Sequence, residues 1–271
     1  RIAIKKNLLY FYLKKYLIMK TVNHFIDGKI YSEKKSRKGP IFNPAIGEQI
    51  AEVELANKAT VEMAIESSAK AFLKWSKTTP INRARILSKY KDLLIKNMEE
   101  LAVMVSEQHG KTIPDAKGSI QRGIEVVEYA TGITDSLKGD HSSSVGTNVD
   151  SHTLRQPLGV CAGITPFNFP AMVPMWMYPI SIACGNSFIL KPSEKDPSCG
   201  LKLAELFYES GLPEGVFNVI NGDKEVVNYI LQSDEISSVS FVGSTPVAKY
   251  IYEESAKNGK RVQALGGAKN H

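Results

Sequence analysis

Apolar residues recur at intervals of three and four along much of the first half of the chain. Over residues 60–75 and again over residues 81–105 this spacing puts them on one face, as in an amphipathic helix. A third helix is predicted over residues 114–132. A short hairpin precedes them at HFIDGKIY, where Asp27 and Gly28 supply the turn. The amino-terminal part is therefore predicted to be mainly helical.

In the second half of the chain, short continuous runs of apolar residues alternate with segments whose apolar residues recur at the spacing of a helix. The runs GVCAGIT, SFILKP, VSFVG and RVQAL indicate buried strands, while LKLAELFYESG and PVAKYIYEESAKNG indicate helices. Strands that alternate with helices predict βαβ units and a mainly parallel sheet, whose ligands bind at the carboxyl ends of strands. Between the two halves, Gly, Ser and alternating apolar residues over 140–156 predict an exposed hairpin arm.

Composition narrows the possible function classes. The chain has 271 residues, of which 43% are hydrophobic, and this is enough for a buried core. The net charge of +6 belongs to residues 1–20, which leaves 28 basic against 28 acidic residues in the rest. The body of the protein therefore gives no sign of a nucleic-acid-binding surface. No run of 18 or more apolar residues is present, so no membrane span is predicted.

Residues 1–18 are basic and apolar, and we expect them to lie outside the fold. Met19 is a more natural start, and the stretch suits translated upstream sequence or a tag. A targeting presequence and a basic amphipathic surface helix are the alternatives. Presequences favour Arg and Ser, whereas this stretch has only Arg1 and no Ser.

The cysteines and histidines predict no metal site. Cys161, Cys184 and Cys199 form no CxxC pair and lack the spacing of zinc ligands, and the five histidines are scattered. Reduced cysteines are typical of intracellular proteins. We therefore expect a cytoplasmic location, or the mitochondrial matrix in a eukaryote.

A side-chain amide follows the first predicted strand of the second half. Asn168, in ITPFNFP, lies between Pro166 and Pro170. Proline removes backbone donors and restricts the chain, which suits an amide held to donate a hydrogen bond to a substrate oxygen. The alternative is a buried turn asparagine that satisfies nearby carbonyl groups.

Two more strand ends carry candidate cofactor-binding residues. FILKPSEKDP ends a strand with Lys191, and Glu194 follows, where an acid accepts hydrogen bonds from ribose hydroxyls and repels a 2′-phosphate. FVGSTPV places Gly243 and Ser244 before a helix, whose free amides offer a phosphate site. The alternatives are a solvated loop of mixed charge and a plain helix cap.

The motifs PFNFP, ILKPSEKDP and FVGST, in this order and at these spacings, resemble the aldehyde dehydrogenase superfamily over nearly all of residues 20–271. GVCAGITPFNFPAMVPMWMYPISIACGN with GAKNH is similar to the CoA-acylating methylmalonate-semialdehyde dehydrogenase branch. The resemblance implies an α/β fold with a Rossmann-like NAD-binding domain. Its expected parts are an N-terminal helical part (19–139), an oligomerisation arm (140–156) and a Rossmann-like part (157–271) that stops at the seam with an absent catalytic domain.

The resemblance also implies a reaction. In this family a cysteine thiolate attacks the aldehyde, NAD accepts the hydride and an acceptor cleaves the thioester. The implied substrates are methylmalonate or malonate semialdehyde and coenzyme A, giving propionyl-CoA or acetyl-CoA and CO2, as in valine and inositol catabolism. A homo-oligomer, dimer or tetramer, is implied as well. None of the three cysteines matches the nucleophile, which is expected beyond His271, so the chain alone is expected to be inactive.

Site residues follow from the resemblance position by position. Asn168 matches the oxyanion donor, Trp176 an aromatic residue of the substrate tunnel, and Arg122 the arginine that binds the substrate carboxylate. An exposed helix arginine is the alternative for Arg122. The positions implied for cofactor binding are Thr165, Pro166, Phe167, Lys191, Glu194, Gly243, Ser244 and Leu265.

One departure from the family pattern bears on the acceptor. Hydrolytic members carry a Glu four residues before the Lys of the Gly-Gly-Lys type motif, and Leu265 stands there. Met177 replaces a Lys that often follows the tunnel Trp. Water then lacks a base, whereas a thiol of pKa near 8.5 is partly ionised near neutrality, so coenzyme A is the expected acceptor. The alternatives are a core role for Leu265, a hydrolytic semialdehyde dehydrogenase, and a non-catalytic nucleotide-binding module.

Overall fold

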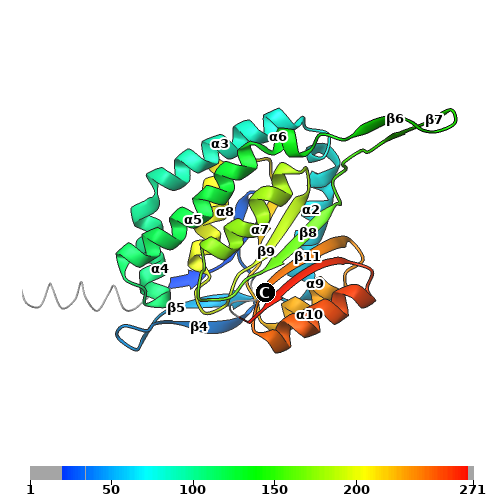
Figure 1. Cartoon of the computed structure of the whole chain (residues 1–271). Coiled ribbons are helices and arrows are strands. Elements are labelled where there is room, and N and C mark those ends of the chain that lie inside the picture. The colour runs from blue at the N-terminus through cyan, green and yellow to red at the C-terminus, as the bar shows by residue number, and fades with distance from the viewer. Residues whose placement is uncertain (1–19, 34, 268–271) are drawn as a thin grey trace, which may run out of the picture.

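A central sheet with helices on both sides organises the protein (Figure 1). The computed structural model describes residues 20–33 and 35–267, so the predicted extension 1–18, Lys269 and His271 lie outside the described residues. Within them the sheet has the strand order β12-β11-β8-β9-β10-β2-β3. In that order the strands span Arg261–Gly266, Ile236–Gly243, Val160–Ile164, Ser187–Lys191, Phe217–Val219, His24–Ile26 and Lys29–Tyr31. The pairs from β12 to β10 are parallel and those to β2 and β3 antiparallel, which confirms a mainly parallel sheet.

The helices cover both faces of the sheet (Figure 1). On one side lie α3 (Pro80–Lys96), α4 (Met98–His109), α5 (Ile113–Thr131), the short α6 (Ile133–Ser136), α7 (Met172–Ala183) and α8 (Ser198–Glu209). On the other lie α2 (Lys58–Trp75), α9 (Lys224–Gln232) and α10 (Thr245–Lys257). Side chains alternate along β8, so that Cys161 joins one core while Val160 and Ala162 join the other. This burial on both faces is why the parallel strands are continuous apolar runs.

The helix predicted over residues 81–105 is wrong as a single element, because α3 ends and α4 begins at Asn97. The Asn97 side chain donates a hydrogen bond of 2.8 Å to the carbonyl oxygen of Leu93. Asparagine competes in this way for backbone groups, and its backbone leaves the helical region here. The apolar period continues across the break, so periodicity alone could not reveal it.

The amino-terminal part also contains strands that the helical prediction missed. β4 (Arg37–Asn43) and β5 (Glu48–Leu55) pair antiparallel, and β1 (Lys20–Val22) pairs parallel with β5 in a separate sheet. In β4 only Ile41 is buried, and even the apolar Phe42 beside it is exposed. A strand buried at so few positions lacks the regular alternation by which strands are recognised.

Two hairpins complete the chain. Between β2 and β3, Asp27 and Gly28 both have positive φ angles, of 56° and 75°, as the predicted two-residue turn requires. β6 (His141–Gly146) and β7 (Val149–His152) pair antiparallel, and the hairpin projects away from the body with every residue exposed (Figure 1). Its assignment to oligomerisation stays a prediction.

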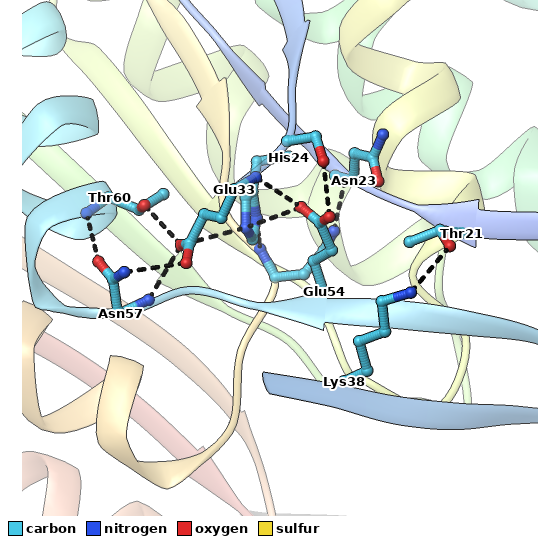
Figure 2. Close-up of polar contacts among 10 residues, drawn as sticks. Thr21, Asn23, His24, Glu33, Lys38, Glu54, Asn57 and Thr60 are labelled. Atoms are coloured by element: carbon cyan, nitrogen blue, oxygen red, sulfur yellow. Dashed lines mark hydrogen bonds and ion pairs between the residues drawn. The ribbon is translucent and has the colours of Figure 1, made fainter. Parts of the chain in front are cut away.

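A buried polar cluster around His24 joins segments of the amino-terminal part (Figure 2). The His24 Nδ1 atom accepts a hydrogen bond of 3.1 Å from the backbone N–H of Asn221. Its Nε2 atom lies 3.8 Å from Glu33 Oε1 and 4.0 Å from Glu54 Oε2. Because Nδ1 is an acceptor, the ring is neutral and carries its proton on Nε2, facing the two carboxylates.

Both carboxylates of this cluster receive hydrogen bonds (Figure 2). Glu33 accepts from the backbone and the side-chain amide of Asn57 and from the Thr60 hydroxyl, all at the start of α2. Glu54, on β5, accepts from the Ser32 hydroxyl and from the backbone N–H of Glu33. The cluster therefore ties the separate sheet and α2 to the edge of the main sheet.

We expect acid to weaken the fold through His24. Burial lowers the pKa of His24 from 6.5, against the opposing charges of Glu54 and Glu33. The unfolded chain then binds the proton more tightly, so stability is lost as the pH falls below about 6.5. Urea unfolding between about pH 7 and about pH 5 should show this decrease, and His24→Asn should reduce it. Asparagine keeps an acceptor for the Asn221 N–H but does not titrate.

The control for this prediction is His152→Gln, because His152 is exposed on the hairpin. That variant should follow the wild-type pH profile of the free energy of unfolding. Parallel profiles for the wild type and His24→Asn would show that His24 does not cause the acid sensitivity.

Candidate functional site

The order of the parallel strands marks one edge of the sheet as a candidate ligand site. From β8 the chain proceeds to β9 and β10 on one side, and then returns to β11 and β12 on the other side. This is a topological switch point, where the loops after β8 and β11 leave in different directions and a ligand can bind between them. The pairing registers align Ile164 with both Lys191 and Phe241, so the loops after these three strands start at the same edge.

Asn168 lies in the loop between β8 and α7. At the start of this loop, the backbone N–H of Thr165 donates a hydrogen bond of 3.2 Å to the carbonyl oxygen of Lys191. Thr165 is buried, Pro166 is half-buried, and Phe167 and Asn168 are exposed. Within the described part of the chain, the Asn168 side chain makes no hydrogen bond. The alternative of a buried turn asparagine is therefore wrong, and its amide is available to a ligand.

Lys191 and Glu194 form an ion pair beside this loop. The distance from Lys191 Nζ to Glu194 Oε2 is 3.2 Å, and the two side chains are 6% and 41% exposed. Burial lowers the pKa of Lys191, while the charge and the hydrogen bond of Glu194 oppose that shift. A solvated loop of mixed charge is thus wrong for Lys191. Glu194 keeps part of its carboxylate exposed, where a hydroxyl donor can reach it.

The ends of β11 and β12 meet the first turn of α10. Ser244 is the N-cap residue of α10 but makes no side-chain capping bond, so the plain-cap alternative has no support. The backbone N–H of Gly267 donates to the carbonyl oxygen of Gly243 across 3.3 Å. A Cβ atom on Gly266 would lie 2.9 Å from the Thr245 Cα atom, so only glycine permits this approach. The first-turn amides of α10, which have no intrahelical acceptor, lie at this edge.

Leu265 lies one residue before that close approach. It pairs with Val242 on β11, and its side chain is 41% exposed. Leu265 is therefore not buried by the described residues. Its position beside the strand ends is compatible with the predicted cofactor contact, which stays a prediction.

Arg122 and Trp176 lie on two helices that pack closely. α5 approaches α7 where a Cβ atom on Gly123 would lie 2.3 Å from the Met175 Cε atom. Arg122 and Trp176 are the chain neighbours of these two residues, and both are exposed. Among the described residues the Arg122 guanidinium has no hydrogen-bond or ion-pair partner. Neither side chain makes a hydrogen bond to Asn168.

Three residues around the Asn168 loop escaped the sequence analysis. The Lys111 Nζ atom lies 3.6 Å from the centroid of the Phe169 ring. The His109 ring stacks on Phe167, with centroids 6.1 Å apart and planes 25° apart, and Lys195 Nζ lies 4.9 Å from the Phe167 centroid. The one signal in the sequence that could have pointed to them is Gly110, which follows a helical pattern of apolar residues. A glycine at this place indicates the end of a helix and a tight connection to the next element.

The described part of the chain contains no thiol suited to attack an aldehyde. Burial raises the pKa of Cys161, Cys184 and Cys199, so that each is protonated near neutrality. In the same part of the chain, no group of three or more His, Cys, Asp or Glu side chains is arranged to hold a metal ion. None of the helices in residues 20–33 and 35–267 combines the length and apolar character needed to cross a bilayer.

Comparison with known proteins gives a consistent result. A family model described as the aldehyde dehydrogenase family matches residues 31–271. The malonate-semialdehyde dehydrogenase of Pseudomonas aeruginosa is 54% identical over 253 residues, which are 93% of this chain and 51% of that protein. That of Bacillus pumilus is 49% identical over 250 residues, which are 92% of this chain and 51% of that protein. The chain thus spans about half the length of the curated relatives it matches.

Solved structures share the same architecture. A Sinorhizobium meliloti protein assigned as a methylmalonate-semialdehyde dehydrogenase, solved with NAD, has a TM-score of 0.91 and 53% identity. The match covers 94% of this chain and 52% of that one. The methylmalonate-semialdehyde dehydrogenase of Oceanimonas doudoroffii gives a TM-score of 0.91 and 53% identity, over 93% of this chain and 52% of that one.

Proposed function

The chain belongs to the aldehyde dehydrogenase family, and from this premise we propose that it supplies the NAD-binding part of a CoA-acylating semialdehyde dehydrogenase. The complete enzyme oxidises methylmalonate or malonate semialdehyde and releases propionyl-CoA or acetyl-CoA with CO2. The observation that carries this proposal is the edge of the sheet where the unpartnered Asn168 amide, the Lys191–Glu194 pair and Gly243 lie together.

The residues at this edge fit NAD. The Lys191 ammonium has three N–H donors, and one of them is hydrogen-bonded to Glu194, so two remain for a ligand. The exposed part of the Glu194 carboxylate can accept hydrogen bonds from ribose hydroxyls. The same carboxylate repels a 2′-phosphate, which favours NAD over NADP. The first-turn amides of α10 and the backbone at Gly243 suit the pyrophosphate. When bound, NAD would be the oxidant that accepts the hydride from the carbon of the former aldehyde group.

Asn168 and Arg122 act on the substrate. The Asn168 amide donates a hydrogen bond to the aldehyde oxygen and stabilises the negative charge that develops there. Arg122 pairs with the carboxylate of the semialdehyde through two parallel N–H donors, and Trp176 contributes an apolar wall. Arg122 is exposed and has no hydrogen-bond or ion-pair partner among the described residues, so its guanidinium is available to a carboxylate; the alternative of an exposed helix arginine predicts the same exposure.

The attacking thiolate comes from sequence beyond His271. Support comes from the protonated state of all three cysteines, of which Cys161 and Cys199 are buried and Cys184 is half-buried, and from relatives about twice as long as this chain. Leu265 lies close to the ends of β11 and β12, and its side chain cannot act as a base that removes a proton from an attacking water. A thiol acceptor ionises far more readily than water, so coenzyme A completes the reaction.

We further propose that the enzyme is a cytoplasmic homo-oligomer and that the hairpin of β6 and β7 is its oligomerisation arm. The hairpin supports this because it buries none of its residues against its own chain. Isolated two-stranded hairpins are marginally stable in water, so a partner surface would stabilise it.

The test is an assay of the product of the complete gene. With NAD and either semialdehyde, we expect sustained NADH formation beyond one equivalent per active site to require coenzyme A, and mass spectrometry to detect the acyl-CoA with one CO2 per NADH. NADP in place of NAD should be a poor oxidant. Free acid formed without coenzyme A would identify a hydrolytic enzyme instead, and a gene product without a further cysteine-bearing domain would contradict the proposal altogether.

A further inference from the structure

We infer that Lys111 is a positioning residue that fixes the loop bearing Asn168 through its contact with the Phe169 ring. This inference rests on the proposed role of Asn168 in the reaction. Asn168 has no hydrogen-bond partner of its own among the described residues, so its place depends on the residues on either side of it. Both of these neighbours, Phe167 and Phe169, are aromatic and are held from outside the loop.

The contact between Lys111 and Phe169 is close. The ammonium lies 3.6 Å from the ring centroid, well within the roughly 6 Å over which a cation is attracted to a ring face. The Lys111 side chain is only 8% exposed. Such contacts are strongest where water is excluded. Burial lowers the pKa of Lys111, and the negative charge of Asp115 is the main effect that opposes this shift.

The backbone around Lys111 is fixed by the ends of two helices. Gly110 ends α4 with a φ of 88°, which glycine adopts readily, and its N–H donates to the carbonyl oxygen of Ser106. A Cβ atom at Gly110 would lie 2.9 Å from Pro44 Cγ. Thr112 is the N-cap residue of α5, and its hydroxyl accepts from the Asp115 N–H. Lys111 is thus the single residue between two helix caps. Its backbone is held in place on both sides, so its side chain can hold the Phe169 ring in a fixed position.

Two carboxylates act on the Lys111 ammonium. Asp115 forms a long ion pair with it, with 3.9 Å between Lys111 Nζ and Asp115 Oδ2, and its side chain is 65% exposed and so surrounded by water. Asp196 is buried, its two carboxylate oxygens have no hydrogen-bond partner in the described part, and burial together with the Glu194 charge raises its pKa to about 9. Asp196 is therefore uncharged near neutrality, which leaves the Phe169 ring as the closest compensating group for the buried cation.

The second aromatic neighbour links the loop to the cofactor site. Phe167 stacks on His109, the last residue of α4, and Lys195 lies over the Phe167 ring. Lys195 directly follows Glu194, which we place at the ribose. The loop of Asn168 therefore rests on the connection from α4 to α5 and on the cofactor loop, and Lys111 is the most buried of the charged contacts.

The experiment uses the complete enzyme with Lys111→Met, which removes the charge and keeps the length. We expect kcat to fall roughly 10- to 100-fold, the effect of a small misplacement of a reacting group, with an unchanged KM for NAD. Lys111→Arg should restore most of the activity, because guanidinium also stacks on rings. Lys117→Met, on α5 just after this connection and without a ring contact, is the control and should keep the wild-type kcat.

A double-mutant cycle separates positioning from general stability. In an Asn168→Ala background Lys111→Met should cause no further loss of kcat, because the group that it positions is already gone. Phe169→Leu should reproduce the loss of Lys111→Met, and it provides a second test if that variant fails to fold. An additive loss in the double variant, or a lowered melting temperature with unchanged kcat, would overturn the inference.

The same set of variants distinguishes this inference from the proposed function. Full activity in Asn168→Ala would overturn the role of Asn168 and, with it, the positioning role of Lys111. A large loss in Asn168→Ala together with wild-type kcat in both Lys111→Met and Phe169→Leu would overturn the inference alone.

Discussion

Replacing Asn168 with alanine is expected to lower kcat of the complete enzyme by roughly 100- to 1000-fold. A donor aimed at the developing oxyanion stabilises the transition state more than the ground state, so its loss affects kcat more than KM. The structure supports so large an effect because the amide is exposed and makes no hydrogen bond within the described chain. Steady-state kinetics with varied semialdehyde and saturating NAD measure it, while NAD binding should be unchanged.

Two further variants sharpen this test. Asn168→Asp keeps the shape of the side chain but replaces the donor with a negative charge, so its kcat should be at least as low. Asn82→Ala changes an exposed asparagine on α3 whose side chain accepts only from Arg85, and it should leave kcat unchanged. A kcat of Asn168→Ala within roughly twofold of wild type would show that the amide does not contact the reacting oxygen.

The family and the strand ends could be predicted from the sequence because their signals are local. A buried parallel strand is a continuous apolar run, and the first polar residues after it must lie at the edge of the sheet. Lys191 and Gly243 were found in this way, and the pairing registers place them at one edge, whereas Thr165 came from the family resemblance alone. The family match over residues 31–271 confirms the resemblance.

The residues that support the Asn168 loop could not be predicted, because their contacts depend on packing between distant segments. His109 and Lys111 lie about sixty residues before Phe167 and Phe169 in the sequence, and nothing in HGKTIP indicates an aromatic partner. The contacts arise only once α4 and α5 pack beside α7. Sequence periodicity predicts which face of a helix is buried but not what its terminal residue will meet.

The buried cluster of His24, Glu33 and Glu54 escaped prediction for a related reason. Each residue comes from a different segment, and charged residues in short strands usually indicate an exposed edge. Here the separate sheet covers them, and five donors satisfy the two carboxylates. A polar cluster can replace an apolar core only when such partners converge, and convergence is a property of the tertiary fold.

Replacing Arg122 with glutamine is expected to lower kcat/KM for either semialdehyde by roughly 30- to 1000-fold. This range corresponds to about 2–4 kcal/mol. A hydrogen bond to a charged group contributes about 1.5–3 kcal/mol, and the variant loses more than one bond but less than two, because glutamine retains one amide donor in place of the two guanidinium donors. Since Arg122 is exposed and unpaired within the described residues, its loss should leave the folded structure intact. The measurement is kcat/KM for a semialdehyde and for propanal, which has no carboxylate and should be oxidised equally by both enzymes.

The comparison between the two aldehydes decides what Arg122 recognises. Arg122→Lys should recover only part of the activity on the semialdehyde, because an ammonium cannot form the two parallel bonds of a guanidinium. Arg85→Gln, at an exposed arginine on α3, is the matched control and should not alter either substrate. An equal loss on both aldehydes would mean that Arg122 maintains the packing of α5 on α7 around Gly123 and Met175, and that the carboxylate is bound elsewhere. A loss confined to the semialdehyde would place the substrate carboxylate between α5 and α7, with the aldehyde carbon directed toward Asn168.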